Sequence, residues 1–305
     1  MSYIYRLAGE DLELAKSELD GFLKSQGIEK KSERLGSIAE SENHPRQLKR
    51  LALVHEVSEK ISEAQELEDL EIPEVQGSFA VRAENHSEEE IDKSKIDSFI
   101  GSSIESEKNS VDLENPENVF KAYFTPDKIV LGKVVEDINR GLFGKRKNDL
   151  RPFSSPISMD PVLARVLVNL SEVKPGERIL DPFCGTGGIL IEAGLCGVGV
   201  SGRDISEEMI EGTKKNLEEY GIINHDLKQQ EISETEADKY NTIITDLPYG
   251  QASKKTDDAV EAFFNIINNF DGKTVFMYNE ASVKGYEADF SVYVHKNLTR
   301  YIYVI

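Results

Sequence analysis

Residues 178–188 read RILDPFCGTGG, which predicts a buried strand, a tight turn and a helix in direct succession. The strand would deliver Asp181 to its carboxyl end, and the glycines within Gly185–Gly188 let the backbone turn sharply and approach a ligand. A dinucleotide site needs the spacing G-x-G-x-x-G, but Leu190 stands where the third glycine belongs. Asp181 would repel a pyrophosphate and attract a cation or an amino group. The turn therefore disfavours NAD or FAD as the ligand.

An acidic residue ends a second predicted strand, in the segment GVGVSGRD (197–204). At this position the carboxylate of Asp204 can accept hydrogen bonds from both ribose hydroxyls of an adenosine. The alternative is that Asp204 caps the helix predicted over residues 207–220. Because the segment follows the glycine turn, we favour the ribose interpretation.

The segment TDLPYG (245–250) follows a fourth predicted strand and pairs a hydrogen-bond acceptor with an aromatic ring. The exocyclic amine of a nucleobase is a poor nucleophile because its lone pair is delocalised into the ring. An acceptor such as Asp246 favours a pyramidal nitrogen, and a ring such as Tyr249 can stack on the base. The alternative is an ordinary strand–helix turn with a packed tyrosine. Together with the glycine turn and Asp204, the segment indicates chemistry on a base amine.

Around these motifs, strand-like and helix-like segments alternate from residue 158 to the C-terminus, which predicts a parallel sheet. Asp160 and Pro161 suit the N-cap and the first position of a helix. The last residues, SVYVHKNLTRYIYVI (291–305), read as two strands joined at residues 296–299. Such a hairpin would make the final strand antiparallel.

The N-terminal half shows mixed strands and helices without a catalytic signature. Its beginning predicts a strand at 3–7, a helix at 11–26, a strand at 50–55 and a helix at 58–67. The continuation predicts a helix at 88–104 with Ile91, Phe99 and Ile100 inward, and strands at 78–84, 111–113, 119–124 and 128–135. Units of this kind are more often recognition modules than enzymes.

The chain is acidic, with 36 Lys and Arg against 56 Asp and Glu and a net charge of −20. This balance argues against a nucleic-acid partner, although an acidic protein can carry a local basic surface. One basic cluster lies in the segment NRGLFGKRKNDLRPF (139–153), which we interpret either as a solvated linker or as a contact for RNA phosphates. Its members are Arg140, Lys145, Arg146, Lys147 and Arg151.

The composition also bears on compartment and metal binding. A hydrophobic content of 39% is enough for a core, so the chain is not disordered as a whole. No window approaches the roughly 18 apolar residues of a membrane span and the start lacks a signal peptide, so we expect a cytoplasmic protein without a membrane partner. Cys184 and Cys196 are too few for a disulfide framework and are expected to be buried packing residues. The five histidines show no ligand spacing, so we expect no metal site.

The motifs DPFCGTGG, GRD and DLPYG, in this order, resemble those of class I S-adenosylmethionine-dependent methyltransferases that act on amino groups. The segments RPFSSPISMDPVLARVLVNL, ILDPFCGTGGILIEAG and NLEEYGI resemble the archaeal and eukaryotic tRNA guanosine-N2 methyltransferases that act at tRNA position 10. The upstream segments SFAVRAEN and VDLENPE resemble parts of that family's THUMP RNA-binding region. The family's usual DPPY reads DLPY here, so Leu247 replaces a proline.

The resemblance implies an α/β fold in two main parts. An N-terminal ferredoxin-like domain (residues 1–70) and a THUMP RNA-binding domain (71–138) would lead through the basic linker (139–155) to a Rossmann-like class I methyltransferase domain (156–305) with a mixed seven-stranded sheet. The implied cofactor-binding residues are Asp181, Phe183, Gly185, Thr186, Gly187, Gly188, Asp204, Ile205 and Glu231. The implied catalytic residues, which hold the target guanine, are Asp246, Leu247, Pro248 and Tyr249.

The implied reaction moves a methyl group from S-adenosylmethionine to the exocyclic N2 of guanosine at tRNA position 10, once or twice. We expect a monomer that binds tRNA. The sequence leaves open whether it uses a small activator subunit, as eukaryotic relatives do. Nearer alternatives are amino-methyltransferases that act on another tRNA guanosine, on ribosomal RNA or on adenine in DNA. More distant alternatives are a nicotinamide-dependent oxidoreductase and a non-catalytic RNA-binding protein with a methyltransferase fold.

Overall fold

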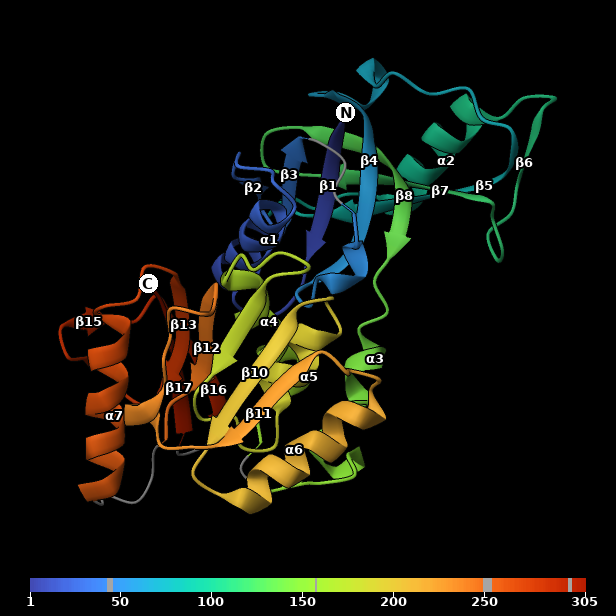
Figure 1. The fold of residues 1–305 in the computed structure, drawn as a ribbon. Helices are drawn as coiled ribbons and strands as arrows, with labels where there is room; N and C mark the ends of the chain where they lie inside the picture. Colours follow the sequence, from blue (N-terminus) through green and yellow to red (C-terminus); the bar gives the residue numbers. More distant parts are fainter. Residues whose placement is uncertain (43–45, 157, 249–253, 296–297) are drawn as a thin grey trace. The chain divides into compact units, whose positions relative to one another are not determined.

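The computed structural model describes residues 1–42, 46–156, 158–248, 254–295 and 298–305 (Figure 1). The chain divides into two compact units. The N-terminal unit comprises Met1–Asp20, Ile28–Lys49 and Leu53–Asn139, and the C-terminal unit comprises Gly21–Gly27, Arg50–Ala52 and Arg140–Ile305. Within the described ranges, no helix has the length and hydrophobicity needed to cross a membrane.

The N-terminal unit is built on a sheet of eight described strands in the order β2-β3-β1-β4-β8-β7-β5-β6. The strands are β1 (Ser2–Leu7), β2 (Glu33–Leu35), β3 (Ile38–Glu42), β4 (Val54–Ala64), β5 (Gly77–Asn85), β6 (Asn109–Val111), β7 (Asn118–Phe124) and β8 (Ile129–Asp137). The helical elements are the first part of α1 (Leu12–Ser25), α2 (Lys93–Ile104) and the short turns η1 (Leu48–Arg50) and η2 (Leu67–Asp69).

The acidic segment around residue 60 is a strand, so the helix predicted at 58–67 is wrong. β4 runs through it and pairs antiparallel with β1 on one side and β8 on the other. Pairing with β1 as far as Glu59 and with β8 as far as Ala64 outweighs the local preference of a charged segment for a helix. The strand predicted at 50–55 accordingly starts only at Val54, and the predictions missed β2 and β3.

Helix α2 starts later than predicted and turns a different face inward. Asp92 caps it, because its carboxylate accepts a 3.1 Å hydrogen bond from the backbone N–H of Lys95. The buried positions are Ile96, Ile100 and Ile104, which pack with β5 and β7 residues in one core cluster. Phe99, predicted to face inward, is 38% exposed, since a spacing of four residues favours the isoleucines.

The C-terminal unit contains a seven-stranded sheet in the order β11-β10-β9-β12-β13-β17-β16, as far as the described residues show. Its first five strands are parallel, and β17 runs antiparallel to both β13 and β16. The predicted mixed sheet and the C-terminal hairpin are therefore confirmed. The strands are β9 (Arg178–Asp181), β10 (Gly199–Asp204), β11 (His225–Gln229), β12 (Thr242–Asp246), β13 (Lys273–Tyr278), β16 (Phe290–His295) and β17 (Leu298–Val304), with a separate pair β14 (Ser282–Val283) and β15 (Tyr286–Glu287).

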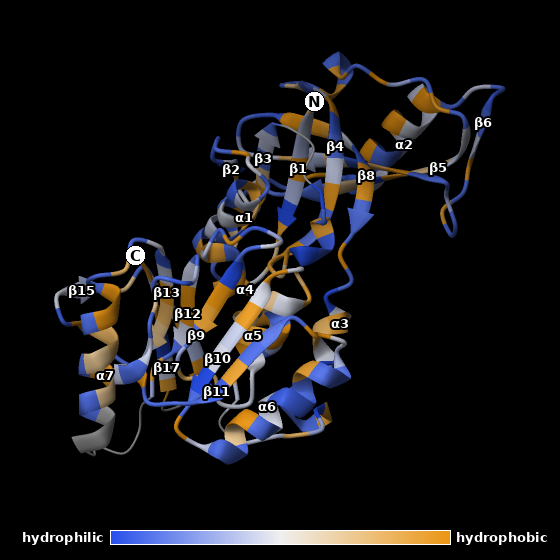
Figure 2. Cartoon of the chain, in the orientation of Figure 1, coloured by the Kyte–Doolittle hydropathy of each residue, from blue (hydrophilic) through white to orange (hydrophobic). Residues whose placement is uncertain are grey.

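Helices pack against this sheet and set the position of its loops. They are α3 (Gly141–Gly144), α4 (Pro161–Leu170), α5 (Gly188–Gly194), α6 (Glu207–Glu219) and α7 (Lys254–Ile267), with the turns η3 (Asn148–Leu150) and η4 (Ile232–Glu234). As predicted, Asp160 caps α4 and Pro161 occupies its first turn. Figure 2 shows hydrophobic residues concentrated in the central strands, whereas α6 is mostly hydrophilic.

Aromatic side chains join α7 to the middle of the sheet. Phe263 and Phe264 of α7 contact Phe276 of β13 edge to face, with ring centroids 5.2 and 5.7 Å away. Phe276 in turn stacks on Tyr303 of β17 at 4.5 Å. β9, β10 and β12 are parallel neighbours in the sheet, so their carboxyl ends lie together at one of its edges.

Candidate active site

A cavity of about 640 Å³ opens at the carboxyl ends of β9, β10 and β12, within the C-terminal unit. It is the place where open α/β sheets bind ligands. The motifs singled out from the sequence all contribute to it. Its lining consists of Met159, Asp181, Pro182, Phe183, Cys184, Gly185, Thr186, Gly188, Ile189, Asp204, Ile205, Gln230, Glu231, Ile232, Ser233, Asp246, Leu247, Pro248, Asp258, Ala259 and Ala262.

The glycine turn has the backbone that the sequence predicts. Gly185 and Gly187 have φ of +50° and +79°, which favours glycine because a side chain would be strained there. A Cβ on Gly187 would also lie 2.8 Å from Cγ2 of Thr213. Thr213 on α6 holds the turn by donating a 2.6 Å hydrogen bond to the carbonyl of Gly185. Thr213 therefore fixes the turn on the side of α6, and the turn lines the cavity on its other side.

Asp181 at the end of β9 lies at the bottom of this turn and is only 2% exposed. Its Oδ1 accepts hydrogen bonds from Thr245 Oγ1 (2.7 Å) and from the backbone N–H of Phe183 (3.2 Å). Burial, opposed by these hydrogen bonds and reinforced by Asp204, raises the pKa of Asp181 to about 7. A cation bound in the cavity would favour the ionised carboxylate, and the ionised carboxylate would favour the cation.

Asp204 at the end of β10 faces the same cavity. Its two oxygens accept hydrogen bonds from the backbone N–H groups of Gly185 (3.1 Å) and Ser206 (2.9 Å). Ser206, not Asp204, is the N-cap of α6, so the alternative interpretation of Asp204 as the cap is wrong. Burial raises the pKa of Asp204, and these N–H groups oppose the rise. Ile205, 68% exposed beside it, adds an apolar surface to the lining.

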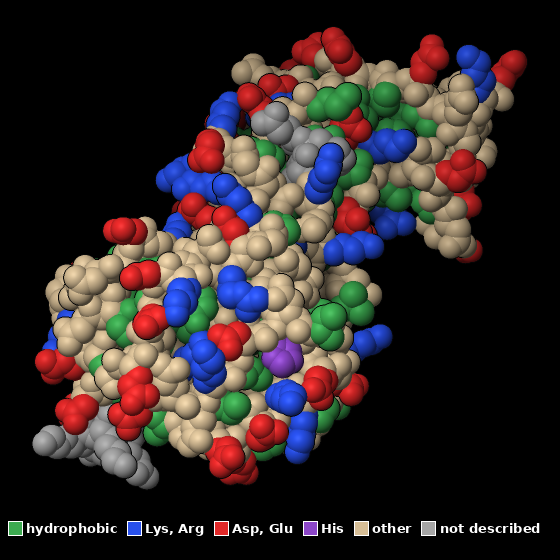
Figure 3. Space-filling view, in the orientation of Figure 1, with side chains coloured by type: hydrophobic (Ala, Val, Ile, Leu, Met, Phe, Trp, Pro, Cys, Tyr) green, Lys and Arg blue, Asp and Glu red, His purple; other side chains and the backbone are tan. Residues whose placement is uncertain are grey.

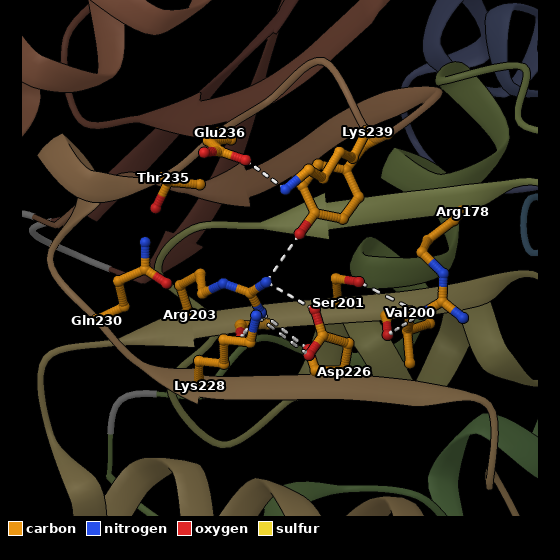
Figure 4. A network of polar contacts seen from close by, with 12 residues as sticks. Arg178, Val200, Ser201, Arg203, Asp226, Lys228, Gln230, Thr235, Glu236 and Lys239 are labelled. Carbon is orange, nitrogen blue, oxygen red and sulfur yellow. Dashed lines mark hydrogen bonds and ion pairs between the residues drawn. The ribbon is translucent and has the colours of Figure 1, made fainter.

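The side chain of Arg203 does not neutralise this acidic end, although it neighbours Asp204 in the chain. It points instead to Asp226 of β11, at 2.7 Å, and to the hydroxyl of Tyr240, at 2.8 Å (Figure 4). The backbone carbonyl of Arg203 accepts a 2.9 Å hydrogen bond from the N–H of Cys184. The side chain of Arg203 thus connects the edge strand β11 and the loop 235–240 to β10, and its backbone carbonyl holds the glycine turn at Cys184.

The cavity is acidic. Asp181, Asp204, Glu231, Asp246 and Asp258 line it, and no Lys or Arg does so among its described lining residues. Glu231 precedes η4 and Asp258 lies on α7. Figure 3 shows acidic side chains interspersed with basic ones on the visible face of this unit. A positively charged ligand fits this set of side chains.

The end of β12 supplies the residues predicted to hold a base. Asp246 lines the cavity and forms an ion pair with Arg300 of β17. Leu247 is fully buried in the α7 core cluster, and its backbone N–H donates a 3.0 Å hydrogen bond to the carbonyl of Met277. A leucine in this place therefore adds a hydrogen bond and core packing that proline lacks. Pro248 lines the cavity, and the predicted Tyr249 lies outside the described residues.

Both cysteines are buried, as predicted. Cys184 and Cys196 are each 5% exposed. Burial and the neighbouring carboxylates of Asp181 and Asp204 raise the pKa of the Cys184 thiol well above its usual value. A thiol is a weak nucleophile when it stays protonated, so this environment disfavours Cys184 as an attacking group. Over the part of the chain that the structure describes, no three His, Cys, Asp or Glu side chains gather as metal ligands.

The basic cluster at 139–153 does not line the cavity, and its members differ in exposure. Lys145 and Lys147 are exposed. Arg146 instead donates two hydrogen bonds to the fully buried Glu192, at 2.7 and 3.1 Å. Arg151 is 5% exposed and donates from Nε to the carbonyl of Arg146. Arg140 also donates a 2.8 Å hydrogen bond, to the carbonyl of Ala52. Three of the five cations therefore make contacts within the protein, and RNA contact by the cluster stays a prediction.

The structure adds lining residues that the sequence did not indicate. Met159 comes from the loop before α4, and Asp258, Ala259 and Ala262 come from α7. Nothing in their local sequence marks them, because they reach the cavity only through helix packing. Conversely, the predicted Gly187 supports the turn without lining the cavity.

The chain matches two family models. One, described as an RMKL-like methyltransferase domain, matches residues 148–274, and a THUMP domain model matches residues 57–133. A tRNA (guanine(10)-N2)-dimethyltransferase from Methanothermobacter thermautotrophicus is 39% identical over 278 residues, which cover 87% of this chain and 82% of that protein. An enzyme of the same name from Pyrococcus abyssi is 34% identical over 286 residues, 84% of each chain.

Among solved structures, TrmN from Thermus thermophilus has a similar fold. The TM-score is 0.54 with 17% sequence identity, and the alignment covers 100% of this chain and 99% of that one. At this level of identity the likeness concerns the fold. It agrees with the predicted combination of an N-terminal α/β region and a class I methyltransferase sheet.

Proposed function

The chain belongs to the family of tRNA (guanine(10)-N2)-dimethyltransferases, and we propose that it transfers methyl groups from S-adenosylmethionine to N2 of the guanine at tRNA position 10. The observation that carries this proposal is the cavity itself. It combines a buried carboxylate below the glycine turn with a second acceptor, Asp246, at the end of β12. The first suits a cationic cofactor, and the second suits a base amine.

The acidic cavity offers a place for each part of the cofactor. The cofactor supplies a methyl carbon bound to a positively charged sulfur. Asp181 and the glycine turn would hold its amino-acid end, and Asp204 would accept hydrogen bonds from its ribose hydroxyls. Ile205 offers an apolar surface to the adenine, and Glu231 lies where an acid could accept from the adenine amine.

Asp246 would act on the guanine. By accepting a hydrogen bond from N2–H, its carboxylate draws the nitrogen lone pair out of conjugation and toward the methyl carbon. The cofactor would supply the methyl carbon, and its sulfur would keep the electron pair of the carbon–sulfur bond as the new N–C bond formed. The nitrogen then holds a strongly acidic proton, which Asp246 accepts and releases to water. Alignment and electrostatics supply most of the rate enhancement, because a sulfonium is already a good leaving group.

The N-terminal unit would hold the tRNA. The THUMP model matches residues 57–133, which run from β4 to β8 of its sheet. The target base must leave its stack to enter the cavity, at a cost of a few kcal/mol, so binding of the rest of the tRNA has to offset that cost. The archaeal relatives are named dimethyltransferases, which supports two successive transfers to the same nitrogen.

The proposal is tested with purified protein, an unmodified tRNA transcript and S-adenosylmethionine labelled in the methyl group. We expect label in the wild-type transcript and none when adenosine replaces the guanosine at position 10. Calorimetry with S-adenosylhomocysteine and with NAD separates the rival classes, because an oxidoreductase would bind the nicotinamide cofactor. Equal labelling of both transcripts would assign the enzyme to another nucleotide.

A further inference from the structure

Arg300 lies on β17, which β12 and β13 separate from β9 and its glycine turn, yet its side chain reaches the proposed target site. It belongs to β17, whose Tyr301 is paired with Tyr278, the last residue of β13. Arg300 is thus one residue beyond the end of this ladder, where its long side chain can pass over the end of β13. It contacts Asp246 at the carboxyl end of β12 and is only 3% exposed.

The ion pair engages one particular oxygen of Asp246. Nη2 of Arg300 pairs with Oδ1, which is buried. The side chain of Asp246 as a whole is 28% exposed and lines the cavity. One carboxylate oxygen is therefore turned toward the arginine, while the part of the side chain that remains accessible faces the cavity.

The charged groups around the cavity indicate how Arg300 affects the charge of Asp246. Four other carboxylates face the cavity, namely Asp181 from β9, Asp204 from β10, Glu231 after β11 and Asp258 from α7. Negative charges gathered in one cavity disfavour further ionisation in general, whereas the opposite charge of Arg300 in contact with Asp246 favours its ionised form. Burial lowers the pKa of Arg300 to about 10, so the guanidinium still carries its charge at neutral pH.

We propose that Arg300 is a positioning residue that keeps Asp246 ionised and holds Oδ1, so that Oδ2 is presented to the N2–H of the guanine. The inference rests on the proposed function, because it assigns the substrate group that Asp246 meets. A guanidinium suits this role, because it stays charged at neutral pH when buried and its rigid plane directs Nη2 at Oδ1. A protonated Asp246 is a weaker hydrogen-bond acceptor and could not take up the N2 proton, so loss of the arginine would weaken this role as the pH falls.

Two substitutions separate charge from orientation. R300M removes the charge with similar side-chain length, and R300K keeps the charge without the rigid plane. R178M is the matched control, because Arg178 lies at the start of β9, at the opposite end of the same sheet, and donates to the carbonyl of Val200. For each protein the single-turnover rate on tRNA is measured from pH 5.5 to 9 at saturating cofactor. Binding of S-adenosylhomocysteine is measured at each pH, because Asp181 titrates in the same range.

We expect R300M to bind S-adenosylhomocysteine like the wild type, to react at least about tenfold more slowly at pH 7, and to lose rate at acid pH with an apparent pKa about one unit or more above the wild type. R300K should lose a few-fold in rate with an unshifted profile, and R178M should keep both. R300M or R300K with the wild-type rate would overturn the inference, as would R300M with an unshifted profile. If R300M does not fold, R300K decides. A wild-type protein that leaves tRNA unmethylated would overturn the proposed function instead.

Discussion

Oγ1 of Thr245 donates a 2.7 Å hydrogen bond to Oδ1 of Asp181 and so joins β12 to β9 beneath the cavity. Both side chains are buried, at 0% and 2% exposed. The bond links the residue before the proposed base acceptor to the carboxylate proposed for the cofactor. Because burial raises the pKa of Asp181 to about 7, the charge of this carboxyl group changes near neutral pH.

Cofactor affinity should therefore depend on pH. A proton and a cationic ligand compete for Asp181, so we expect the affinity for S-adenosylmethionine to be constant above about pH 8. Well below pH 7 it should fall by up to about tenfold per pH unit. Calorimetry across this range measures it, and D181N should bind at least about 100-fold more weakly at pH 8 without the slope. An affinity that is flat down to pH 5.5 would contradict the role of Asp181.

The same substitution should stabilise the cofactor-free protein at high pH. Burial raises the pKa of Asp181 above its unfolded value, so the folded state holds a proton that the unfolded state has lost between about pH 4 and 7. The free energy of unfolding should fall as the pH rises through this window. D181N removes the ionisation, and we expect it to raise this free energy by about 2 kcal/mol or more at pH 8, with little change at pH 4. Equal effects at both pH values in urea titrations would contradict it.

Leu247 should be a stability residue of this chain. Proline there would remove the hydrogen bond to the carbonyl of Met277 and leave space in the α7 core cluster. We expect L247P to lower the free energy of unfolding by about 2–4 kcal/mol. L247M, which keeps both features, should cost less than about 1.5 kcal/mol. Chemical denaturation measures both variants, and equal stability of L247P and wild type would show that the loop accommodates proline.

The sequence predicted the cavity well where a motif lies at a strand end. The glycine turn, Asp181, Asp204 and Asp246 follow buried strands, and parallel strands bring such ends to one edge. Positive φ at Gly185 and Gly187 confirms why glycine is needed. These inferences succeeded because each rests on local geometry together with one topological rule.

Contacts made across the sheet could not be predicted in this way. Arg300 reaches Asp246 only because β17 pairs antiparallel with β13 in a particular register, and the segment around Arg300 does not by itself indicate which strand it pairs with. The inward position of Arg146 could not be predicted either, since its partner Glu192, a buried acid on α5, is distant in the sequence. The segment of β4 was predicted as a helix because its many charged residues obscure the alternation of inward and outward side chains that is typical of a strand.

Asp246 should be needed for the chemical step and not for cofactor binding. We expect D246A to lower the single-turnover rate about 100-fold or more, by analogy with the loss of one donor or acceptor that acts in a transition state. Binding of S-adenosylhomocysteine should stay within a few-fold of the wild type. A variant with weakened cofactor binding and an unchanged rate at saturation would place Asp246 on the cofactor instead.

The exposed lysines of the basic cluster should account for its contribution to tRNA affinity. We expect the double variant K145A/K147A to bind tRNA more weakly and to reduce the slope of log K against log salt by about 0.7–0.9 for each lost phosphate contact. The double variant K228A/K239A carries the same change in charge at two other exposed lysines of the unit and serves as the control. Equal slopes for K145A/K147A and wild type would make the segment a plain linker.

Nucleoside mass spectrometry on a tRNA transcript treated with the wild-type protein and S-adenosylmethionine identifies both the methylated atom and the nucleotide. We expect N2-methylguanosine first and N2,N2-dimethylguanosine later, both absent when the guanosine at position 10 is replaced. Methylation at another atom or another nucleotide, with the position-10 guanosine unchanged, would contradict it.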